Sequence, residues 1–328
     1  MRSVYKINLL VIIMFKKMEY VYEVYKEKSF TRAAEKLFIS QPCLSAAIKK
    51  IEEKVGMPIF ERRYSSIRPT KIGEEYIKAV EKMMSIEKEF DSKINDINQV
   101  QYGHITVGGS NYVSSYILPL VAAKFAENYP KIEITLMEAG SNELEHMLNS
   151  EELDLMIDSF DNEDVLHESY PLIDEKILLA VPAGSKSNIG LEKYQINPHD
   201  IYAGKVCIDK VPKISIDRFK EENFILLKSG HNMHKYAMKV FKNKDFSPKI
   251  AFKLDQLSTS YRFTALGNGA CFLTDTIFKY HDFKDEVVLY NLDESGTRTL
   301  YIAQKRNRYT SNAMEKFIEI AKETIAKG

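Results

Sequence analysis

Polar side chains on one predicted helix, residues 41–55, have the chemistry needed to read double-stranded DNA. Gln41, Ser45 and Lys49 recur every four residues, so they share one helix face, and Lys50 lies beside them. A glutamine amide can pair with an adenine edge, a hydroxyl can bond to a base or a phosphate, and an ammonium group neutralises phosphate. An ordinary solvated helix face is the alternative. The opposite face carries the apolar residues Leu44, Ile48, Ile51 and Val55.

The elements around this helix predict a winged helix-turn-helix. Ser40 is a good N-cap, Pro42 is tolerated in the first turn, and Gly56 ends the helix. Ser29 caps a shorter helix before it, and residues 58–69 predict two short strands joined by a turn. We therefore expect DNA contacts from Thr31, Arg32, Gln41, Pro42, Ser45, Lys49, Lys50, Arg62, Arg63 and Arg68.

A gapless motif over residues 29–73 resembles the N-terminal signature of LysR-type transcriptional regulators. The matching residues include Ser29-Phe30-Thr31-Arg32-Ala33-Ala34, Ser40-Gln41-Pro42, Leu44-Ser45, Phe60-Glu61-Arg62 and Gly73. Ala46 stands where the family usually has Arg or Lys, so one customary contact is missing. Across residues 14–328, the resemblance implies a DNA-binding head, a dimerising linker helix and an effector domain like that of periplasmic binding proteins.

Charge is unevenly distributed along the 328 residues. The net charge is zero, yet residues 1–72 hold 15 Lys and Arg against 7 Asp and Glu, and the rest holds 31 against 39. A basic N-terminal module in an otherwise acidic protein favours a polyanion as partner, and double-stranded DNA fits. We expect a cytoplasmic protein without a membrane partner, since the apolar run at residues 7–13 is too short to cross a membrane.

The chain start carries an extra segment. Residues 1–13 do not fit the pattern that follows, and Met14 opens the part that resembles the family. We expect a tail at 1–13, a winged helix-turn-helix at 14–72 and a linker helix at 73–100.

The predicted linker helix, from Thr70 to about Val100, carries one narrow apolar seam. Its residues recur at three or four positions, which is typical of a coiled coil. The resemblance implies a homodimer through this helix, and a tetramer of such dimers is left open. Alternatively, the seam packs against the chain's own later domain. The seam consists of Ile72, Tyr76, Val80, Met83, Ile86, Phe90, Ile94 and Ile97.

Residues 103–328 predict an α/β effector domain of two lobes. Strands and helices alternate with short connections, for example a helix at 114–128 between two strands, so the sheets should be mainly parallel. We place lobe 1 at about 103–174 and 282–328, including a strand at 287–291, and lobe 2 at 175–281.

Several polar residues at predicted strand ends and helix starts are candidate effector contacts. Unpaired N–H groups and the helix dipole favour an anion there, so we expect a small anionic metabolite in a cleft between the lobes. Plain caps and turns are the alternative for each residue. The candidates are Ser110, Asn111, Tyr112, Ser141, Ser159, Ser229, His231 and Asn232.

Signatures of catalysis, cofactors and metals are missing from the sequence. His231 and His234 are three residues apart, but nothing with matching spacing completes a zinc site. Cys43, Cys207 and Cys271 are few and far apart, so we expect buried, inert thiols, with a disulfide switch as the alternative. We predict a regulator that is not an enzyme and has no cofactor. A solute-binding protein, or a helix-turn-helix fused to a catalytic domain, remains the alternative.

Overall fold

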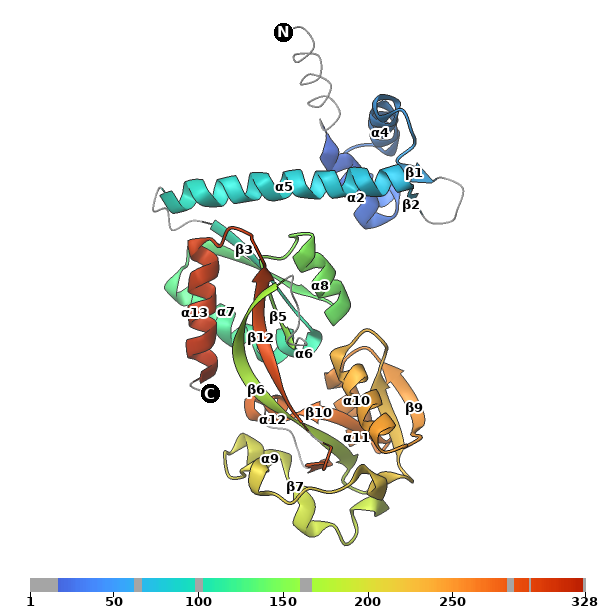
Figure 1. The fold of residues 1–328 in the computed structure, drawn as a ribbon, viewed down its shortest axis with the longest axis vertical. Helices are drawn as coiled ribbons and strands as arrows, with labels where there is room; N and C mark the ends of the chain where they lie inside the picture. Colours follow the sequence, from blue (N-terminus) through green and yellow to red (C-terminus); the bar gives the residue numbers. More distant parts are fainter. Residues whose placement is uncertain are drawn as a thin grey trace. The chain divides into compact units, whose positions relative to one another are not determined.

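The protein divides into two compact units, residues 1–91 and 92–328. The computed structural model (Figure 1) describes residues 17–61, 67–97, 103–159, 167–281, 286–294 and 296–326. In those residues, no helix is both long and apolar enough to cross a membrane.

The first unit contains the predicted helix-turn-helix. Ser29 and Ser40 cap α3 and α4, each accepting a backbone N–H bond at 3.4 Å, and Gly56 ends α4 at φ +81°. Leu44, Ile48 and Ile51 are buried as their spacing predicts. The elements are α2 (Met18–Glu27), α3 (Phe30–Lys36), α4 (Gln41–Val55), β1 (Phe60–Glu61), β2 (Arg68–Pro69) and the start of α5 (Lys71–Ile97).

A small hydrogen-bonded junction fixes the strand pair against α4 and α5. Glu52 Oε1 accepts the N–H groups of Ile59 (2.8 Å) and Phe60 (3.3 Å). The Thr70 hydroxyl donates to Pro58 O at 2.7 Å and accepts the N–H of Gly73 at 3.1 Å, so Thr70 caps α5 as predicted. Because β1 and β2 pair antiparallel, this junction sets the direction of the hairpin.

The apolar seam of α5 changes its surroundings along the helix. Tyr76, Ile77 and Val80 are buried in the core of the first unit. Further along, Ile86 and Phe90 are 67% and 63% exposed. A helix with such an exposed apolar stripe has the surface expected of a helix that pairs with another helix.

The second unit is built on two parallel strand groups joined by two long antiparallel strands. In the first half, β3 pairs in parallel with β4 and β5, and in the second half β8 pairs in parallel with β9 and β10. The long strands β6 and β12 pair with each other and join the halves (Figure 1). The strands are β3 (Gly103–Gly109), β4 (Ile132–Glu138), β5 (Leu155–Ser159), β6 (His167–Pro182), β7 (Gln195–Ile196), β8 (Asn223–Leu227), β9 (Lys249–Leu254), β10 (Ala270–Thr274), β11 (Val287–Tyr290) and β12 (Thr297–Lys305).

The helices cover these sheets on both sides. In the first half α13 packs along α7, where the rings of Phe125 and Phe317 lie 5.3 Å apart. The helices are α6 (Asn111–Tyr116), α7 (Leu118–Asn128), α8 (Ser141–Asn149), α9 (Pro198–Tyr202), α10 (Asn232–Asn243), α11 (Leu257–Ala265), α12 (Asp275–Tyr280) and α13 (Asn312–Ala326).

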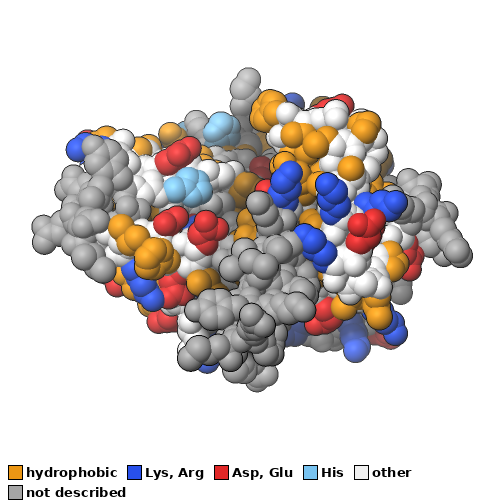
Figure 2. All heavy atoms as spheres, turned by 90° about the horizontal axis from the view of Figure 1, so that it is seen from above, with side chains coloured by type: hydrophobic (Ala, Val, Ile, Leu, Met, Phe, Trp, Pro, Cys, Tyr) orange, Lys and Arg blue, Asp and Glu red, His pale blue; other side chains and the backbone are white. Residues whose placement is uncertain are grey.

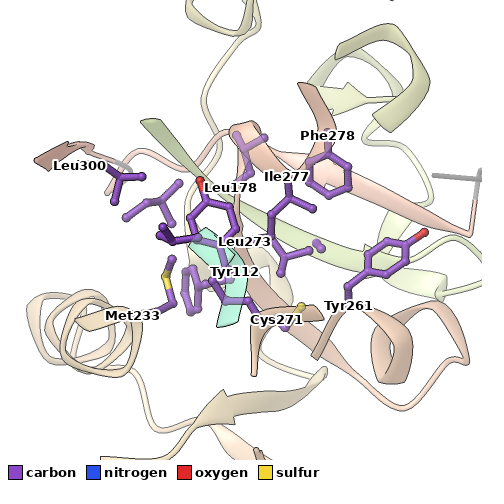
Figure 3. Packing of buried hydrophobic residues seen from close by; sticks show 14 of the residues in the cluster. Tyr112, Leu178, Met233, Tyr261, Cys271, Leu273, Ile277, Phe278 and Leu300 are labelled. Atoms are coloured by element: carbon purple, nitrogen blue, oxygen red, sulfur yellow. The ribbon is translucent and has the colours of Figure 1, made fainter. Parts of the chain in front are cut away.

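One hydrophobic core extends through both halves of the second unit. Figure 3 shows Tyr112 and Leu300 from the first half packed near Met233, Leu273 and Ile277 from the second. Burial of this continuous apolar surface is the main stabilising contribution and keeps the two halves together.

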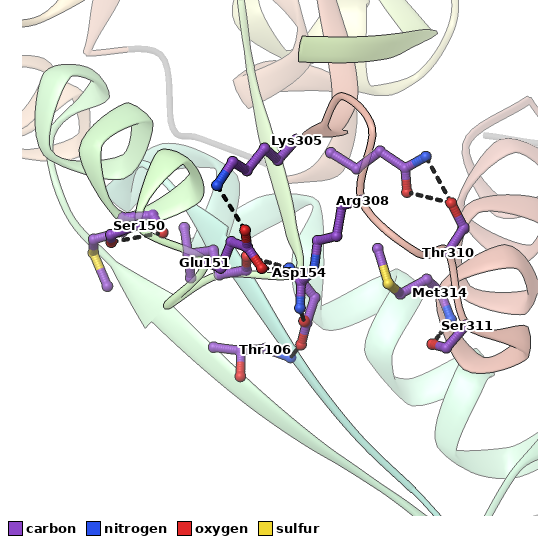
Figure 4. Close-up of polar contacts among 12 residues, drawn as sticks. Thr106, Ser150, Glu151, Asp154, Lys305, Arg308, Thr310, Ser311 and Met314 are labelled. Carbon is purple, nitrogen blue, oxygen red and sulfur yellow. Dashed lines mark hydrogen bonds and ion pairs between the residues drawn. The ribbon is translucent and has the colours of Figure 1, made fainter. Parts of the chain in front are cut away.

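A polar cluster fixes the far end of β12 in the first half (Figure 4). Arg308 is 9% exposed, pairs with Asp154 and donates to Leu153 O at 3.0 Å. The other Asp154 oxygen accepts the N–H of Thr106 at 2.8 Å. Lys305 pairs with Glu151 at 2.6 Å. These bonds connect the C-terminal end of β12 to β3 and to the start of β5.

Three sequence expectations need correction. The helix expected at 114–128 is two helices, α6 and α7, which meet at Ile117 just before Pro119. Strand β11 was expected in lobe 1, but it pairs with β6 and β7 in the second half, so the boundary at 282 is wrong. The sheets are mainly parallel only within each half, because β6 and β12 are antiparallel to their neighbours.

Gly73 provides a test of the junction between the wing and α5. A Cβ at this position would lie 2.1 Å from Ile59 O, which is backbone and cannot move without displacing β1. We expect Gly73→Ala to lower the free energy of unfolding by about 1–3 kcal/mol, measured by chemical denaturation. Gly184→Ala is the matched control, since nothing lies within 4 Å of its Cβ. Equal stability of the two variants would contradict the described junction.

Candidate functional site

The predicted reading face of α4 is open to solvent. Gln41, Lys49 and Lys50 are exposed, and Ser45 is half-buried. The Gln41 amide donates to Ser45 Oγ at 2.8 Å, which holds the two side chains together on one face. Pro42 is exposed at the start of the helix. An aligned amide and hydroxyl next to two lysines is an arrangement suited to a base edge flanked by phosphates.

The other predicted DNA contacts fall into three groups. Thr31 and Arg68 are exposed. Arg32 is 63% exposed, but its guanidinium donates to Glu27 O at 2.5 Å and lies 3.5 Å from the Glu27 carboxylate, so it is directed toward α2. Arg62 and Arg63 lie outside the described residues. In the view of Figure 2, several Lys and Arg side chains lie close together beside hydrophobic and acidic side chains.

A second candidate site is a cavity of about 300 Å³ in the second unit. The N-terminal ends of α6, α8, α10 and α11 lie around it, contributing Ser110, Ser141, His231 and Gln256. None of these four helices has a side-chain cap hydrogen bond. The sequence reasoning thus found the correct parts of the chain for this cavity.

Six of the eight predicted effector residues line this cavity, and two do not. Ser159 lines a second cavity, of about 480 Å³, where its backbone oxygen accepts a 2.6 Å bond from the Asn232 amide. Ser229 lines neither cavity. The six lining residues are Ser110, Asn111, Tyr112, Ser141, His231 and Asn232.

Among the described residues, the side chains of Asn232 and Ser258 donate hydrogen bonds that cross between the halves beside the cavity. Asn232 of α10 reaches Ser159 at the end of β5, and the Ser258 hydroxyl of α11 donates to Asn111 Oδ1 of α6 at 2.9 Å. The other end of the Asn111 side chain donates to Glu138 at 3.1 Å. Residues from both halves are therefore coupled at the cavity wall.

Sequence reasoning missed a buried charge cluster behind the cavity. The Tyr112 hydroxyl donates to Glu175, and Arg298 Nε donates to the other Glu175 oxygen at 2.6 Å. Glu175 is fully buried, and the Arg298 guanidinium lies 5.9 Å from the Tyr112 ring centre. Burial, with the charge of Glu175, raises the pKa of Tyr112 well above its usual value. Tyr112 therefore supports the wall through its hydroxyl and is not free to bond to a ligand there.

Four carboxylates line the cavity, and only Asp158 among them is buried. Glu138, Glu143 and Asp255 are exposed, and Asp255 pairs with Lys228 at 2.7 Å. Among the described lining residues, Arg298 is the one lysine or arginine, and it is already bound to Glu175. The expectation of an anionic ligand finds no support in this lining, because its charge would repel one. Three of these carboxylates lie at or directly after the ends of strands: Glu138 on β4, Asp158 on β5 and Asp255 after β9. Because ligands bind at the carboxyl ends of parallel strands, this position in the sequence could have identified them as lining residues.

Family models match both units. Residues 15–74 match the bacterial regulatory helix-turn-helix protein, lysR family, and residues 98–326 match the LysR substrate binding domain. The chain belongs to the LysR family. It is a DNA-binding transcriptional regulator with a domain that binds a small molecule.

Relatives of this LysR-family regulator match most of its length, and one matches about two thirds of it. An uncharacterized HTH-type transcriptional regulator, YcgK of Bacillus subtilis (strain 168), is 29% identical over 319 residues, 94% of each chain. Full-length CbnR complexed with its target DNA is 14% identical with a TM-score of 0.62, covering 94% of this chain and 99% of CbnR. The regulatory domain of Synechocystis PCC6803 CcmR in complex with 2-PG is 18% identical with a TM-score of 0.56, covering 68% and 97%. These two structures show the shared fold.

The cysteines and histidines were the sequence candidates for metal binding or redox chemistry. In the part of the chain that the structure describes, no three His, Cys, Asp or Glu side chains are grouped to hold a metal ion. His234 Nδ1 lies 2.7 Å from Leu227 O, which occupies one of its ring nitrogens. Cys271 is buried, which raises its pKa to about 12. Cys207 and Cys43 are exposed, so the expectation that all three thiols are buried is wrong.

The buried Glu175–Arg298 pair gives a stability prediction. Glu175→Gln leaves the Arg298 guanidinium without its partner charge, and we expect the free energy of unfolding of the second unit to fall by about 3–5 kcal/mol. Chemical denaturation followed by tyrosine fluorescence measures it. Adding Arg298→Met should recover much of the loss, because no unpaired charge then remains. A double variant no more stable than Glu175→Gln alone would argue against the pair.

Proposed function

We propose that α4 reads base edges through Gln41 and Ser45, while Lys49, Lys50 and Arg68 neutralise phosphates. The observation that carries this proposal is the exposed Gln41–Ser45 pair, backed by a buried apolar stripe on the same helix. Thr31 contributes a further contact to the phosphate backbone of the DNA. The Arg32 side chain can contact DNA only if its ion pair with Glu27 breaks, so we assign it a secondary role.

Two chains associate through the exposed part of α5 and present two reading helices to a site with two half-sites. The exposed Met83, Ile86 and Phe90 support this arrangement. A tetramer of such dimers is compatible with it. The segments 14–72, 73–100 and 103–328 act as DNA-binding, dimerising and effector-binding parts, and 1–13 as an extra tail. We place the protein in the cytoplasm, where its DNA is.

The regulatory ligand binds in the 300 Å³ cavity and shifts the arrangement of the two halves. The hydrogen bonds that cross beside the cavity support this, because a ligand that replaces or reinforces them favours one arrangement over another. The same residues bind and do no chemistry on the ligand, so the protein is not an enzyme. Turnover of a bound metabolite would favour the catalytic alternative.

Gln41→Ala tests the reading role. It should reduce discrimination at one base pair by about 1–3 kcal/mol, because the paired contact of the Gln41 amide with a base edge is lost. Lys49→Ala should weaken binding to every sequence, since it removes a phosphate contact. Fluorescence anisotropy on the specific site and on random DNA separates the two. If Gln41→Ala lowers affinity for both DNAs equally, Gln41 does not read a base.

Phe90→Glu tests the dimer. A carboxylate in the apolar seam should weaken self-association at least about tenfold, because the interface would then bury an unpaired charge. Sedimentation velocity over a concentration series measures it. Leu266→Glu is the matched control, since Leu266 is 72% exposed and lies outside α5. Unchanged association in Phe90→Glu would exclude this seam as the interface.

A further inference from the structure

The cavity contains a buried carboxylate oxygen that the protein leaves without a partner. Asp158 is 4% exposed and lines the cavity at the end of β5. Its Oδ1 accepts the N–H of Ser159 at 2.7 Å, whereas Oδ2 has no hydrogen bond of good geometry among the described residues. The side chains of Ser141 and Asn232 lie close enough to stabilise the charged carboxyl, but neither completes a bond to Oδ2. A buried acceptor without a donor is costly, so the site is completed when a donor arrives from outside the chain.

The charge balance around Asp158 favours a donor that is positively charged. Arg298 is the neighbouring cation, but Glu175 already binds it at 2.6 Å, so these two charges offset each other. Arg298 also attracts the Asp158 carboxylate, but no other lysine or arginine among the described residues lines the cavity. Burial raises the pKa of Asp158 above its usual value, and the attraction of Arg298 offsets only part of that rise. A cationic group beside Oδ2 would balance this charge.

The uncapped helix N-termini around the cavity do not change the preference of the cavity for a positively charged ligand. Their positive ends favour an anion, but the chain already places carboxylates beside two of them. Glu143 lies in the first turn of α8, and Asp255 directly precedes the N-cap of α11. Among the described residues, the hydrogen-bond partner of Glu138 is neutral, the Asn111 amide. Asp158 inside and Glu138 at the exposed wall thus remain available to a cation.

We propose that the cavity binds a ligand through a positively charged amino group, held by Asp158 and Glu138. This inference rests on the proposed function, because it names the chemistry of the effector. An ammonium group supplies N–H donors to Oδ2 and a charge that balances the lining. Two sources share this chemistry: a simple amine, or the amino group of an amino acid. The cavity's volume of about 300 Å³ suits a small molecule of either kind.

Thermal unfolding of the full-length protein with matched compounds tests the proposal. The amine set is putrescine and the standard L-amino acids, and the counterparts without an amino group are succinate and L-lactate, all at equal millimolar concentration. We expect at least one amine to raise Tm, and its counterpart to leave Tm unchanged. Putrescine against the amino acids decides between the two sources. The proposal is overturned if no amine raises Tm. It is also overturned if succinate or L-lactate raises Tm and no amine does.

Variants of the lining localise the binding. Asp158→Asn keeps the shape of the side chain and removes its charge, and we expect amine affinity to fall at least about tenfold by titration calorimetry. Glu138→Gln, on the exposed wall, should give a smaller loss and does not depend on a buried substitution being tolerated. Glu133→Gln is the matched control, because Glu133 lies on the same strand β4 but does not line the cavity. Unchanged amine affinity in both Asp158→Asn and Glu138→Gln overturns the assignment.

DNA binding of the same samples separates this inference from the function on which it rests. Fluorescence anisotropy on specific and random DNA is measured in parallel. If specific DNA binding persists while no amine binds, the inference fails and the DNA-binding function stands. If specific DNA binding is absent while an amine binds through Asp158, the ligand assignment stands and the proposed function fails.

Discussion

The pairing of β6 with β12 is the constraint on which the second unit depends. These two strands run side by side between the halves, with Glu175 directly opposite Arg298. The Glu175–Arg298 ion pair is buried, and Glu175 also accepts the Tyr112 hydroxyl. These bonds fix α6, which carries Tyr112, against both strands. The cavity is formed where α6 and α8 of one half face α10 and α11 of the other. This strand pair therefore joins the two halves that face each other across the cavity.

The first unit depends on a different constraint, which is the fixed position of α4 and the hairpin on a small core. A short helix must present polar groups to DNA while remaining rigid, and α4 does so by burying Leu44, Ile48 and Ile51. Glu52 and Thr70 then bind the hairpin backbone, so the wing follows α4 and α5. Beyond Val80, the apolar side chains of Ile86 and Phe90 on α5 are exposed. The polar face of α4 and this apolar stripe are therefore separate surfaces on two different helices.

Local signals made much of the structure predictable from sequence. Ser40, Pro42 and Gly56 defined α4 because capping and helix termination depend on neighbouring residues. The strand and helix starts around Ser110, Ser141 and His231 located the cavity for the same reason. Glu175, Arg298 and Asp158 were not predicted, since their importance arises from pairing between segments more than 100 residues apart, or from the lack of a partner. The prediction that β11 belongs to lobe 1 was wrong for the same reason, because strand pairing depends on contacts between distant segments.

The most direct test of the central claim is selection from a random double-stranded DNA library with the full-length protein, followed by sequencing. The account predicts enrichment of one motif with two related half-sites whose centres lie about one helical turn, or a multiple of it, apart. Affinity for that motif should fall steeply with salt, as expected when several phosphates are neutralised. Recovery of unrelated sequences without a common motif would contradict a sequence-specific regulator that binds as a dimer.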